Sequence, residues 1–225
     1  MEKRSIALDG PGGAGKSTLA KRAASYFKLV YVDTGALYRC IALYVFRNNV
    51  KFKDEARVAE LLPNISIEIN YDEEGTQRMI LCGEDVTADI RSPDISMGAS
   101  DVSALLPVRD FLLSMQREIA GKHDVIMDGR DIGTVVLPDA GLKVFLTAKP
   151  EVRAKRRFLE LMAKNVSTSL DEVEKEMLLR DKNDSERDIA PLKAADDSVT
   201  LDTTYLDLDE SFDALCELIS GRFGI

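Results

Sequence analysis

Several residue types that specialised proteins require are scarce in this sequence. Its 225 residues contain no tryptophan, one histidine and three cysteines. The cysteines, Cys40, Cys82 and Cys216, are odd in number and widely spaced, which suits a reduced cytoplasmic protein better than a disulfide framework or a zinc site. The histidine, His123, lies outside every motif described below, so we expect it on the surface before a strand rather than at a catalytic position.

Long apolar runs and an excess of positive charge are also missing. No run approaches the roughly 18 apolar residues of a membrane span. The first residues hold no long apolar stretch before the first motif, so we expect neither a signal peptide nor an anchor there. The chain has 30 Lys and Arg against 39 Asp and Glu, a net charge of −9. Such a chain repels the nucleic-acid backbone unless its basic residues gather on one surface. We therefore expect neither a membrane nor a nucleic acid as a partner.

What the sequence does have is an ordinary globular composition with an alternating pattern. Hydrophobic residues make up 45% and charged residues 31%, and the length allows one domain with insertions or two small domains. Longer amphipathic stretches alternate with five short apolar runs, at residues 6–8, 29–32, 125–127, 143–146 and 199–201. This alternation predicts an α/β fold in which helices cover both faces of a parallel sheet.

Aspartate follows four of these five runs, as Asp9, Asp33, Asp128 and Asp202. Open α/β sheets bind ligands beyond the carboxyl ends of their strands, where these side chains would lie. Any one of them is explained as simply by a cap on the following turn or helix. Their repetition after four runs favours a binding edge.

Two segments depart from the alternation. Apolar and polar residues alternate from Ile65 to Tyr71, and a turn then leads to a further apolar run at 79–82. This pattern predicts a small antiparallel meander within an insertion at residues 63–97. A second insertion-like region, residues 150–191, is highly charged and helical in pattern. The predicted core then consists of residues 1–62, 98–149 and 192–225.

A complete phosphate-binding loop lies between the first predicted strand and a predicted helix at 16–27. It matches G-x-x-x-x-G-K-[ST] with Gly10, Pro11, Gly12, Gly13, Ala14, Gly15, Lys16 and Ser17. The loop's backbone N–H groups and the helix N-terminus would face phosphate oxygens, Lys16 would reach the β- and γ-phosphates, and Ser17 would offer its hydroxyl to Mg²⁺. A glycine-rich turn capped by Ser17 would explain neither Lys16 nor this context. The loop predicts triphosphate binding and leaves ATPases, GTPases and small-molecule kinases open.

Asp128 closes the apolar run at 125–127 in the manner of a Walker B carboxylate, which makes it a candidate for contact with Mg²⁺, partly through water. No glutamate follows it to polarise a water, as an ATPase motor would require. The guanine-reading Asn-Lys-x-Asp signature of GTPases is not found after a strand. Both observations favour transfer to a bound acceptor over hydrolysis.

Arginines at the predicted binding edge could hold a second phosphate group. Arg39 and Arg130 follow two of the strand-ending aspartates, and the planar guanidinium binds phosphate with two parallel hydrogen bonds. Arg180, Asp184 and Arg187 would share one face of a helix. Arg153, Arg156 and Arg157 would share another face. Taken alone, both sets are explained as simply by salt-bridged or solvated helix surfaces.

Six motifs occur in a fixed order along nearly the whole chain: Gly10–Thr18, Asp33–Arg39, Asp128–Val136, Arg153–Arg157, Arg180–Arg187 and Ala190–Leu192. In this order and spacing they resemble the bacterial cytidylate kinases. The stretch Gly-Arg-Asp-Ile-Gly-Thr-Val-Val within the third motif is the most specific of them, more so than the phosphate loop.

The resemblance implies transfer of the γ-phosphate of ATP to CMP or dCMP, with Mg²⁺. It also implies a P-loop NTPase-type three-layer fold with a five-stranded parallel sheet in the order 2-3-1-4-5, and a monomeric protein. Residues 63–97 would be the insertion that binds the nucleoside monophosphate. Residues 150–191 would be a helical lid that closes over ATP.

The resemblance further implies roles for individual residues. Thr18 would extend the ATP-binding loop, and Lys16 would act in catalysis with Arg130, Arg180 and Arg187. The acceptor phosphate would be held by Arg39, Arg130 and Arg187, with Arg180 between the two phosphate sites. Cytosine would be read by Ser100, Arg109 and Asp131, and Asp184 would bind the sugar. Thr34 stands where serine also occurs in the family, and the lid arginines would be Arg153, Arg156 and Arg157.

Three alternatives remain at this point. A related kinase could act on UMP or on a non-nucleotide acceptor, although Asp131 would then face an acceptor at position 4 of uracil instead of the cytosine amino group. A nucleotide-dependent switch could keep the loop without the chemistry. A nucleic-acid partner is disfavoured by the charge of the chain.

Overall fold

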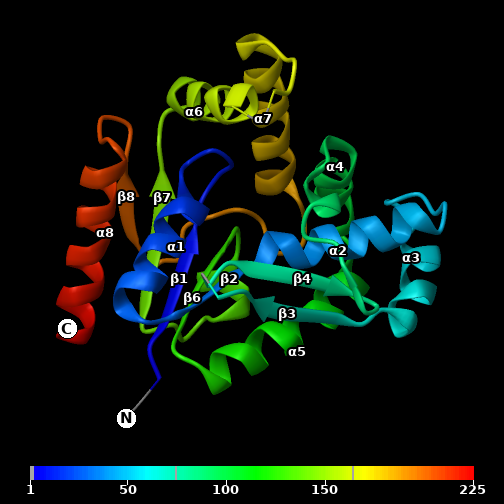
Figure 1. The fold of residues 1–225 in the computed structure, drawn as a ribbon, viewed down its shortest axis with the longest axis horizontal. Helices are drawn as coiled ribbons and strands as arrows, with labels where there is room; N and C mark the ends of the chain where they lie inside the picture. The colour runs from blue at the N-terminus through cyan, green and yellow to red at the C-terminus, as the bar shows by residue number, and fades with distance from the viewer. Residues whose placement is uncertain (1–2, 74, 164) are drawn as a thin grey trace. The chain divides into compact units, whose positions relative to one another are not determined.

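A computed structural model describes residues 3–73, 75–163 and 165–225 of the chain (Figure 1). The chain divides into two compact units. We call the first, residues 1–30 and 123–225, unit 1, and the second, residues 31–122, unit 2. Each unit is described by itself.

A five-stranded sheet contains the strands of unit 1 together with residues 30–33, which span the sequence boundary between the two units (Figure 1). Its order is β2-β6-β1-β7-β8, and β1 runs parallel to β6 and β7, as β7 does to β8. Because the strands of a second sheet take the intervening numbers, β6, β7 and β8 are the third, fourth and fifth strands of this sheet along the chain. The strands are β1 (Ser5–Asp9), β2 (Val30–Asp33), β6 (Val125–Gly129), β7 (Leu142–Thr147) and β8 (Val199–Asp202).

The central strands are buried on both faces. Ile6, Ala7 and Leu8 of β1 are fully buried, and so are the first three residues of β6. A strand covered on both sides shows an unbroken apolar run instead of alternation, which is why these segments are recognisable in the sequence. The predicted α/β fold with a parallel sheet is confirmed.

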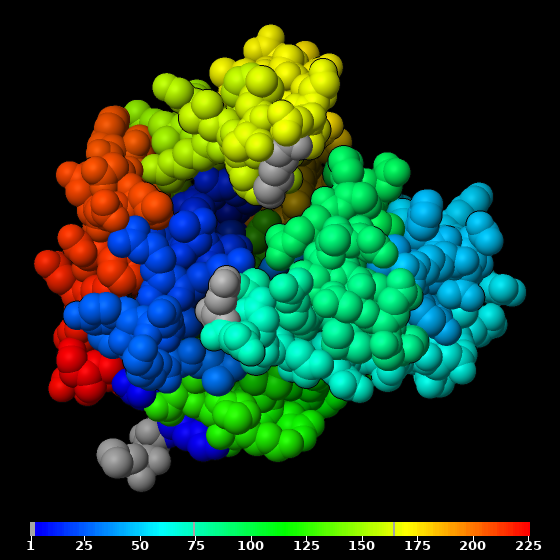
Figure 2. Space-filling model, in the orientation of Figure 1, coloured from blue at the N-terminus to red at the C-terminus, as the bar shows by residue number. Residues whose placement is uncertain are grey.

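Helices α1 (Lys16–Phe27) and α8 (Leu208–Phe223) pack against each other in unit 1. Figure 2 shows their adjoining surfaces, blue for α1 and orange to red for α8. The predicted helix at 16–27 has the observed bounds of α1. Two further helices, α6 (Pro150–Ala163) and α7 (Leu170–Glu186), lie side by side, and a short π-helical turn, η3 (Ile132–Val136), follows β6.

Unit 2 contains a second, antiparallel sheet, which confirms the predicted meander. Its strands pair in the order β3-β4-β5, with Ile67 opposite Leu81. The elements of this unit after β2 are α2 (Thr34–Arg47), α3 (Glu55–Leu61), η1 (Leu62–Asn64), β3 (Ile67–Tyr71), β4 (Gln77–Leu81), β5 (Glu84–Asp85), η2 (Asp89–Arg91), α4 (Pro93–Val102) and α5 (Leu106–Lys122).

One apolar cluster joins these elements. It contains buried side chains of α2, α4, α5 and the meander, including Leu37, Met79, Val102 and Leu112. In β4 the inward residues alternate with outward ones, as expected for a sheet with one covered face. The division into core, insertion at 63–97 and lid at 150–191 stays a prediction; the compact unit that holds the meander extends over residues 31–122.

The three cysteines are free thiols in different surroundings. Cys40 of α2 is fully buried, and burial raises its pKa to about 12. Cys82, in the turn after β4, is exposed, and Cys216 of α8 is half-buried. His123 is exposed directly before β6, as predicted. Within the described ranges, no helix combines the length and apolar character that crossing a bilayer would need.

Candidate active site

The phosphate loop of unit 1 connects β1 to α1 and is closely packed at its start. A Cβ atom at Gly10, whose φ is +147°, would overlap the backbone oxygen of Leu146. At Gly13, with φ +70°, a Cβ would lie 2.8 Å from Cε of Met177 and 3.0 Å from the carbonyl oxygen of Arg153. Both positions therefore require glycine, because of the backbone conformation and because of the neighbouring atoms.

Lys16 folds back over this loop. Its side chain is 6% exposed, and Nζ donates a hydrogen bond of 2.8 Å to the carbonyl oxygen of Pro11. Burial, followed by the charge of Arg130, lowers the pKa of Lys16 well below its ordinary value, against the opposing effect of Asp128. Arg180 adds to the lowering. The loop thus lies among cations, where the negative charge of a polyphosphate would favour the protonated lysine.

A hydroxyl and a carboxylate meet at the start of α1. Ser17 Oγ donates to Asp128 Oδ2 at 2.5 Å, which brings together the two residues predicted to contact Mg²⁺. Mg²⁺ prefers oxygen ligands and keeps several waters or substrate phosphates in its shell, so these two residues fit it. Among the described residues, no cluster of three or more His, Cys, Asp or Glu side chains could hold a metal by itself.

Asp184 of α7 lies among three arginines of unit 1. It is 4% exposed and accepts a hydrogen bond of 2.9 Å from Nε of Arg130. Burial by itself would raise the pKa of this carboxyl, but the charges of Arg130, Arg180 and Arg187 outweigh burial and lower it. Asp184 is therefore ionised and balances three cations. A solvated, salt-bridged helix surface does not describe this arrangement.

Arg187 lies outside the helix that was predicted to present it. Helix α7 ends at Glu186, and Arg187 has extended backbone angles, so the predicted shared face applies to Arg180 and Asp184 alone. The Arg187 side chain turns back instead: Nε donates to the carbonyl oxygen of Ala190 at 2.6 Å, and Nη2 lies 3.4 Å from Asp131 Oδ1. The polypeptide beyond α7 thereby brings Arg187 to Asp131.

The three arginines of α6 have three different surroundings. Arg153 is buried, and its Nη1 donates to the carbonyl oxygen of Gly12 at 2.9 Å and to Asp181 at 2.6 Å. Arg156 is half-buried and donates to Thr203. Arg157 pairs with Glu160 on the surface. A common solvated face therefore does not describe all three, because Arg153 is buried against the phosphate loop at Gly12. Their role at ATP stays a prediction.

In unit 2 the predicted acceptor residues lie at the start of α2. Asp33 caps the helix by accepting from the N–H of Ala36 at 2.9 Å, and its other oxygen accepts from Nη2 of Arg39 at 2.8 Å. A Cβ at Gly35 would lie 3.1 Å from Arg39 Nη1, so glycine leaves room for this pair. Thr34, the first residue of α2, is buried.

The other two predicted acceptor residues of unit 2 lie on α4 and α5. Ser100 of α4 is half-buried, and its carbonyl oxygen accepts from the Ser103 hydroxyl. Arg109 of α5 is buried, donates to the carbonyl oxygen of Ser103 at 2.9 Å, and lies 5.7 Å from the ring centre of Tyr38. Ser103 therefore links the two helices that carry Ser100 and Arg109.

The four strand-ending aspartates divide into two kinds. Asp33 and Asp202 cap their own following turn or helix, as the simpler explanation expects. Asp9 and Asp128 instead bind segments far away in the sequence, at Ile132 and Ser17.

Two residues that the sequence did not single out as site residues contact predicted ones or their neighbours. Asp181 accepts from the Gly12 N–H at 3.4 Å, and Gln77 Oε1 accepts from the Asp33 N–H at 2.9 Å. Asp181 lies inside the motif Arg180–Arg187, but its position in the sequence did not indicate a partner.

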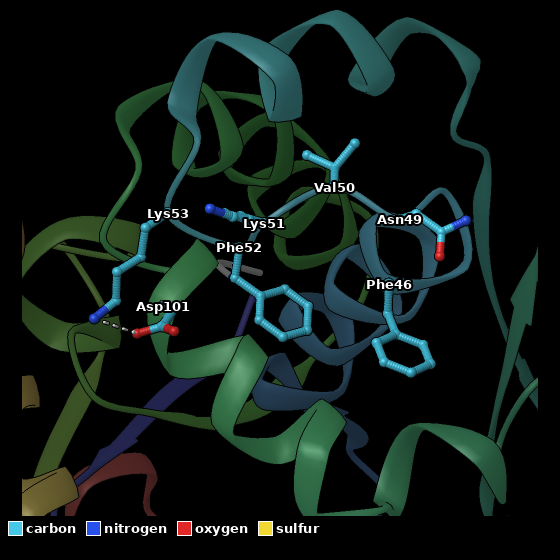
Figure 3. Close-up of a pocket in the computed structure, with 7 residues that line it drawn as sticks. All are labelled: Phe46, Asn49, Val50, Lys51, Phe52, Lys53 and Asp101. Carbon is cyan, nitrogen blue, oxygen red and sulfur yellow. Dashed lines mark ion pairs between the residues drawn. The ribbon is translucent and has the colours of Figure 1, made fainter.

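A pocket of about 530 Å³ lies elsewhere on unit 2 (Figure 3). It opens between the end of α2, the following loop and α4, and Lys53 and Asp101 form an ion pair of 3.4 Å at its edge. None of its lining residues is a predicted site residue: Phe46, Asn49, Val50, Lys51, Phe52, Lys53 and Asp101.

Comparison with known proteins identifies the family of the chain. The profile of one protein family, described as cytidylate kinase, matches residues 6–221. The chain belongs to the cytidylate kinase family. It is 48% identical over 217 residues to a cytidylate kinase of Lactobacillus johnsonii, covering 96% of this chain and 94% of that relative. A cytidylate kinase of Caldicellulosiruptor bescii is also 48% identical, over 97% of this chain and 96% of its own length.

A solved structure extends the comparison to the fold. An uncharacterized protein from Eubacterium ventriosum aligns over 98% of this chain and 100% of its own, with a TM-score of 0.56 and 13% identity. That likeness concerns the fold alone.

The predicted site residues of this cytidylate kinase family member fall into both units. Unit 2 holds Thr34, Arg39, Ser100 and Arg109, and the remaining ones belong to unit 1.

Proposed function

We propose that this chain transfers the γ-phosphate of ATP to CMP or dCMP by direct in-line displacement, with Mg²⁺ held at Ser17 and Asp128. The chain is an ATP-dependent (d)CMP kinase by family. The observation that supports the proposed mechanism is the set of cations around the phosphate loop. The charges of Arg130 and Arg180 act on Lys16. Asp184 is the carboxylate near Arg130, Arg180 and Arg187. Phosphoryl transfer needs such fixed positive charge more than it needs covalent chemistry.

The donor phosphates would bind at residues 10–18, with Lys16 on the β- and γ-phosphates. An oxygen of the CMP phosphate supplies the electron pair that forms the new bond to the γ-phosphorus. The bond from that phosphorus to the β–γ bridging oxygen breaks, and its electron pair leaves with ADP. The attacking oxygen is already ionised near neutral pH, so no general base is required. Lys16 and the arginines stabilise the negative charge of the phosphoryl group while it is transferred.

The acceptor phosphate would be held by Arg39, Arg130 and Arg187, with Arg180 between the two phosphate sites. Arg130 and Arg39 now bind Asp184 and Asp33, so a phosphate would exchange with or share these carboxylate partners. Because the carboxylates already orient the guanidinium groups, less side-chain entropy is lost when phosphate binds.

Cytosine would be read by Ser100, Arg109 and Asp131, and Asp184 would bind the sugar. The cytosine amino group can donate to the Asp131 carboxylate, and its ring acceptors can receive from Arg109. Uracil presents an acceptor where cytosine has the amino group, so Asp131 would face a lone pair. A buried site built on such pairs discriminates strongly against the wrong base. Thr34 would add a hydroxyl contact.

When bound, Mg²⁺ supplies charge neutralisation on the β- and γ-phosphates. The region 150–191, with Arg153, Arg156 and Arg157, would close over ATP and exclude water. We further propose that the protein acts as a monomer in the cytoplasm, on small-molecule substrates, with no nucleic-acid or membrane partner.

The test is ADP release with Mg·ATP and CMP, dCMP, UMP, AMP, GMP or no acceptor. Turnover confined to CMP and dCMP supports the acceptor and the base reading together. Equal turnover with UMP keeps the kinase and rejects the role of Asp131. ADP release without any acceptor would make the protein a hydrolase and reject transfer.

A further inference from the structure

Asp9 joins two parts of unit 1 that are far apart in the sequence. The residue ends β1, directly before the phosphate loop, and is 5% exposed. Its Oδ1 accepts from the backbone N–H of Ile132 at 2.8 Å, and its Oδ2 accepts from the N–H of Gly133 at 2.7 Å. These partners lie 123 and 124 residues further along the chain. Both oxygens of one buried carboxylate thus bind consecutive amides.

The same residue also fixes the other end of this segment. In the parallel pairing of β1 with β6, Asp9 is the register partner of Gly129. Arg130 and Asp131 are the two residues between Gly129 and Ile132. The span that carries these two side chains is therefore attached to Asp9 at both ends, by strand pairing before it and by the carboxylate after it.

Gly133, which follows this span, lies close to Asp9 and Lys143. A Cβ at Gly133 would lie 3.4 Å from Asp9 Oδ2 and 3.2 Å from Cδ of Lys143. The Lys143 ammonium binds Asp197 at 2.8 Å. Burying a carboxylate is costly unless its oxygens accept hydrogen bonds, and here both accept from the span. The backbone of Ile132 and Gly133 is thus held where Asp9 requires it.

We propose that Asp9 is a positioning residue for the acceptor: it holds Arg130 and Asp131 in place and thereby sets the preference for cytosine. This inference rests on the proposed function, in which Arg130 holds the acceptor phosphate and Asp131 reads the base. Asp9 itself touches neither substrate in this mechanism. A shift of the span by a fraction of an ångström changes the angle at which the Asp131 carboxylate meets the base, and hydrogen bonds weaken steeply with angle.

The experiment compares Asp9→Asn with Asp202→Asn. Asp202 also ends a strand of this sheet, and its Oδ1 accepts two hydrogen bonds, both from Thr204 in its own turn. Steady-state kinetics with CMP and UMP give kcat/KM for each, and the KM for ATP is measured in parallel. For Asp9→Asn we expect the CMP-to-UMP ratio of kcat/KM to fall about tenfold or more. For Asp202→Asn the ratio should stay within about twofold of the original, because its bonds are local.

A lower CMP-to-UMP ratio of kcat/KM with an unchanged KM for ATP distinguishes a positioning role from destabilisation of the fold, because destabilisation would affect the binding of both substrates. If Asp9→Asn fails to fold, Asp9→Glu tests the same contacts, because the carboxylate is kept but is moved by one methylene relative to the N–H groups of Ile132 and Gly133; we expect the ratio to fall there also. A ratio that Asp9→Asn or Asp9→Glu leaves at the Asp202→Asn value overturns the inference.

Asp131→Ala is measured alongside to keep this inference distinguishable from the proposed function. If Asp131→Ala lowers the ratio while Asp9→Asn does not, the positioning role of Asp9 is rejected and the base reading stands. If Asp131→Ala leaves the ratio unchanged, the base reading itself is wrong, and the inference is rejected with it.

Discussion

The two units hold their site arginines in different ways. In unit 1, Arg130 binds Asp184, 54 residues away, and Arg187 approaches Asp131, 56 residues away. In unit 2, Arg39 donates to the Asp33 carboxylate and Arg109 donates to the carbonyl oxygen of Ser103, and each partner lies 6 positions earlier in the sequence. The site of unit 1 thus depends on tertiary contacts between charged groups, whereas that of unit 2 is oriented by neighbours in the sequence.

Distant segments of unit 2 are joined mainly by apolar packing. The cluster of α2, α4, α5 and the meander supplies it, including Ile41, Ile95 and Leu112. The difference between the units predicts different sensitivities. Removal of a carboxylate should damage unit 1 most, and a change in side-chain volume should damage unit 2 most.

The largest expected effects are on catalysis, where a substitution in each unit should affect a different substrate. Lys16→Ala removes the cation of the phosphate loop and should lower kcat about 10³-fold, because the phosphoryl group loses a positive charge that stabilises it during transfer. Arg39→Ala removes an acceptor contact and should lower kcat/KM for CMP about 10- to 100-fold while the KM for ATP changes little. Both follow from steady-state kinetics with each substrate varied. A rise in the KM for ATP in Arg39→Ala would contradict the division, and circular dichroism should show both variants folded.

The second expected effect concerns stability. Asp184→Ala leaves Arg130, Arg180 and Arg187 without the carboxylate that balances them, and we expect the free energy of unfolding to fall by about 3–5 kcal/mol. Asp33→Ala loses a helix cap and a local pair, and about 1–2 kcal/mol is expected. Urea unfolding measures both. Sulfate should restore part of the loss in Asp184→Ala, because an anion can take the place of the carboxylate. Equal losses in the two variants would contradict the comparison.

A third prediction concerns the pH dependence of the stability of unit 1, to which the buried carboxyl of Asp9 contributes. Burial raises the pKa of Asp9 from 3.8 to about 6. Between these values the folded protein binds the proton more tightly than the unfolded chain, so stability falls as pH rises from about 4 to about 6 and is level above that. The part due to Asp9 is about 3 kcal/mol at most. Urea unfolding of the original chain and of Asp9→Asn should therefore diverge across this window. Parallel curves would show that Asp9 does not titrate there.

The smallest effect tests packing in unit 2. A Cβ at Gly98 of α4 would lie 2.5 Å from Cζ of Phe52, so Gly98→Ala must displace the ring and should cost about 1–3 kcal/mol. Gly121→Ala in α5 meets no atom within 4 Å and should stabilise the helix by up to about 1 kcal/mol. Thermal unfolding of both variants provides the comparison. A stabilised Gly98→Ala would mean that Phe52 does not restrict α4.

The sequence alone predicted what depends on local pattern. The buried strands of the sheet, the bounds of α1 and the antiparallel meander follow from apolar runs, alternation and a motif of eight residues. A helix cap was also one of the two explanations that the sequence offered for Asp33. These features require information from a few neighbouring residues only.

What could not be predicted depends on which segments meet in space. Spacing placed Arg187 on a helix that in fact ends one residue earlier, and it gave no indication that Arg153 is buried against the phosphate loop. Asp9 appeared as one strand-ending aspartate among four, although its partners are more than a hundred residues away. A contact of that range is set by the register of the sheet, which no local pattern encodes.

The two cysteines of unit 2 have a practical consequence. Cys82 is exposed, so thiol reagents can reach it in the folded protein. Cys40, next to Arg39, is covered and has a pKa of about 12, so it holds its proton and reacts only when α2 opens. The ratio of the two labelling rates therefore reports how often the helix that carries Arg39 detaches, without any introduced probe. Measured with and without CMP, the same ratio would report how firmly the acceptor holds that helix closed.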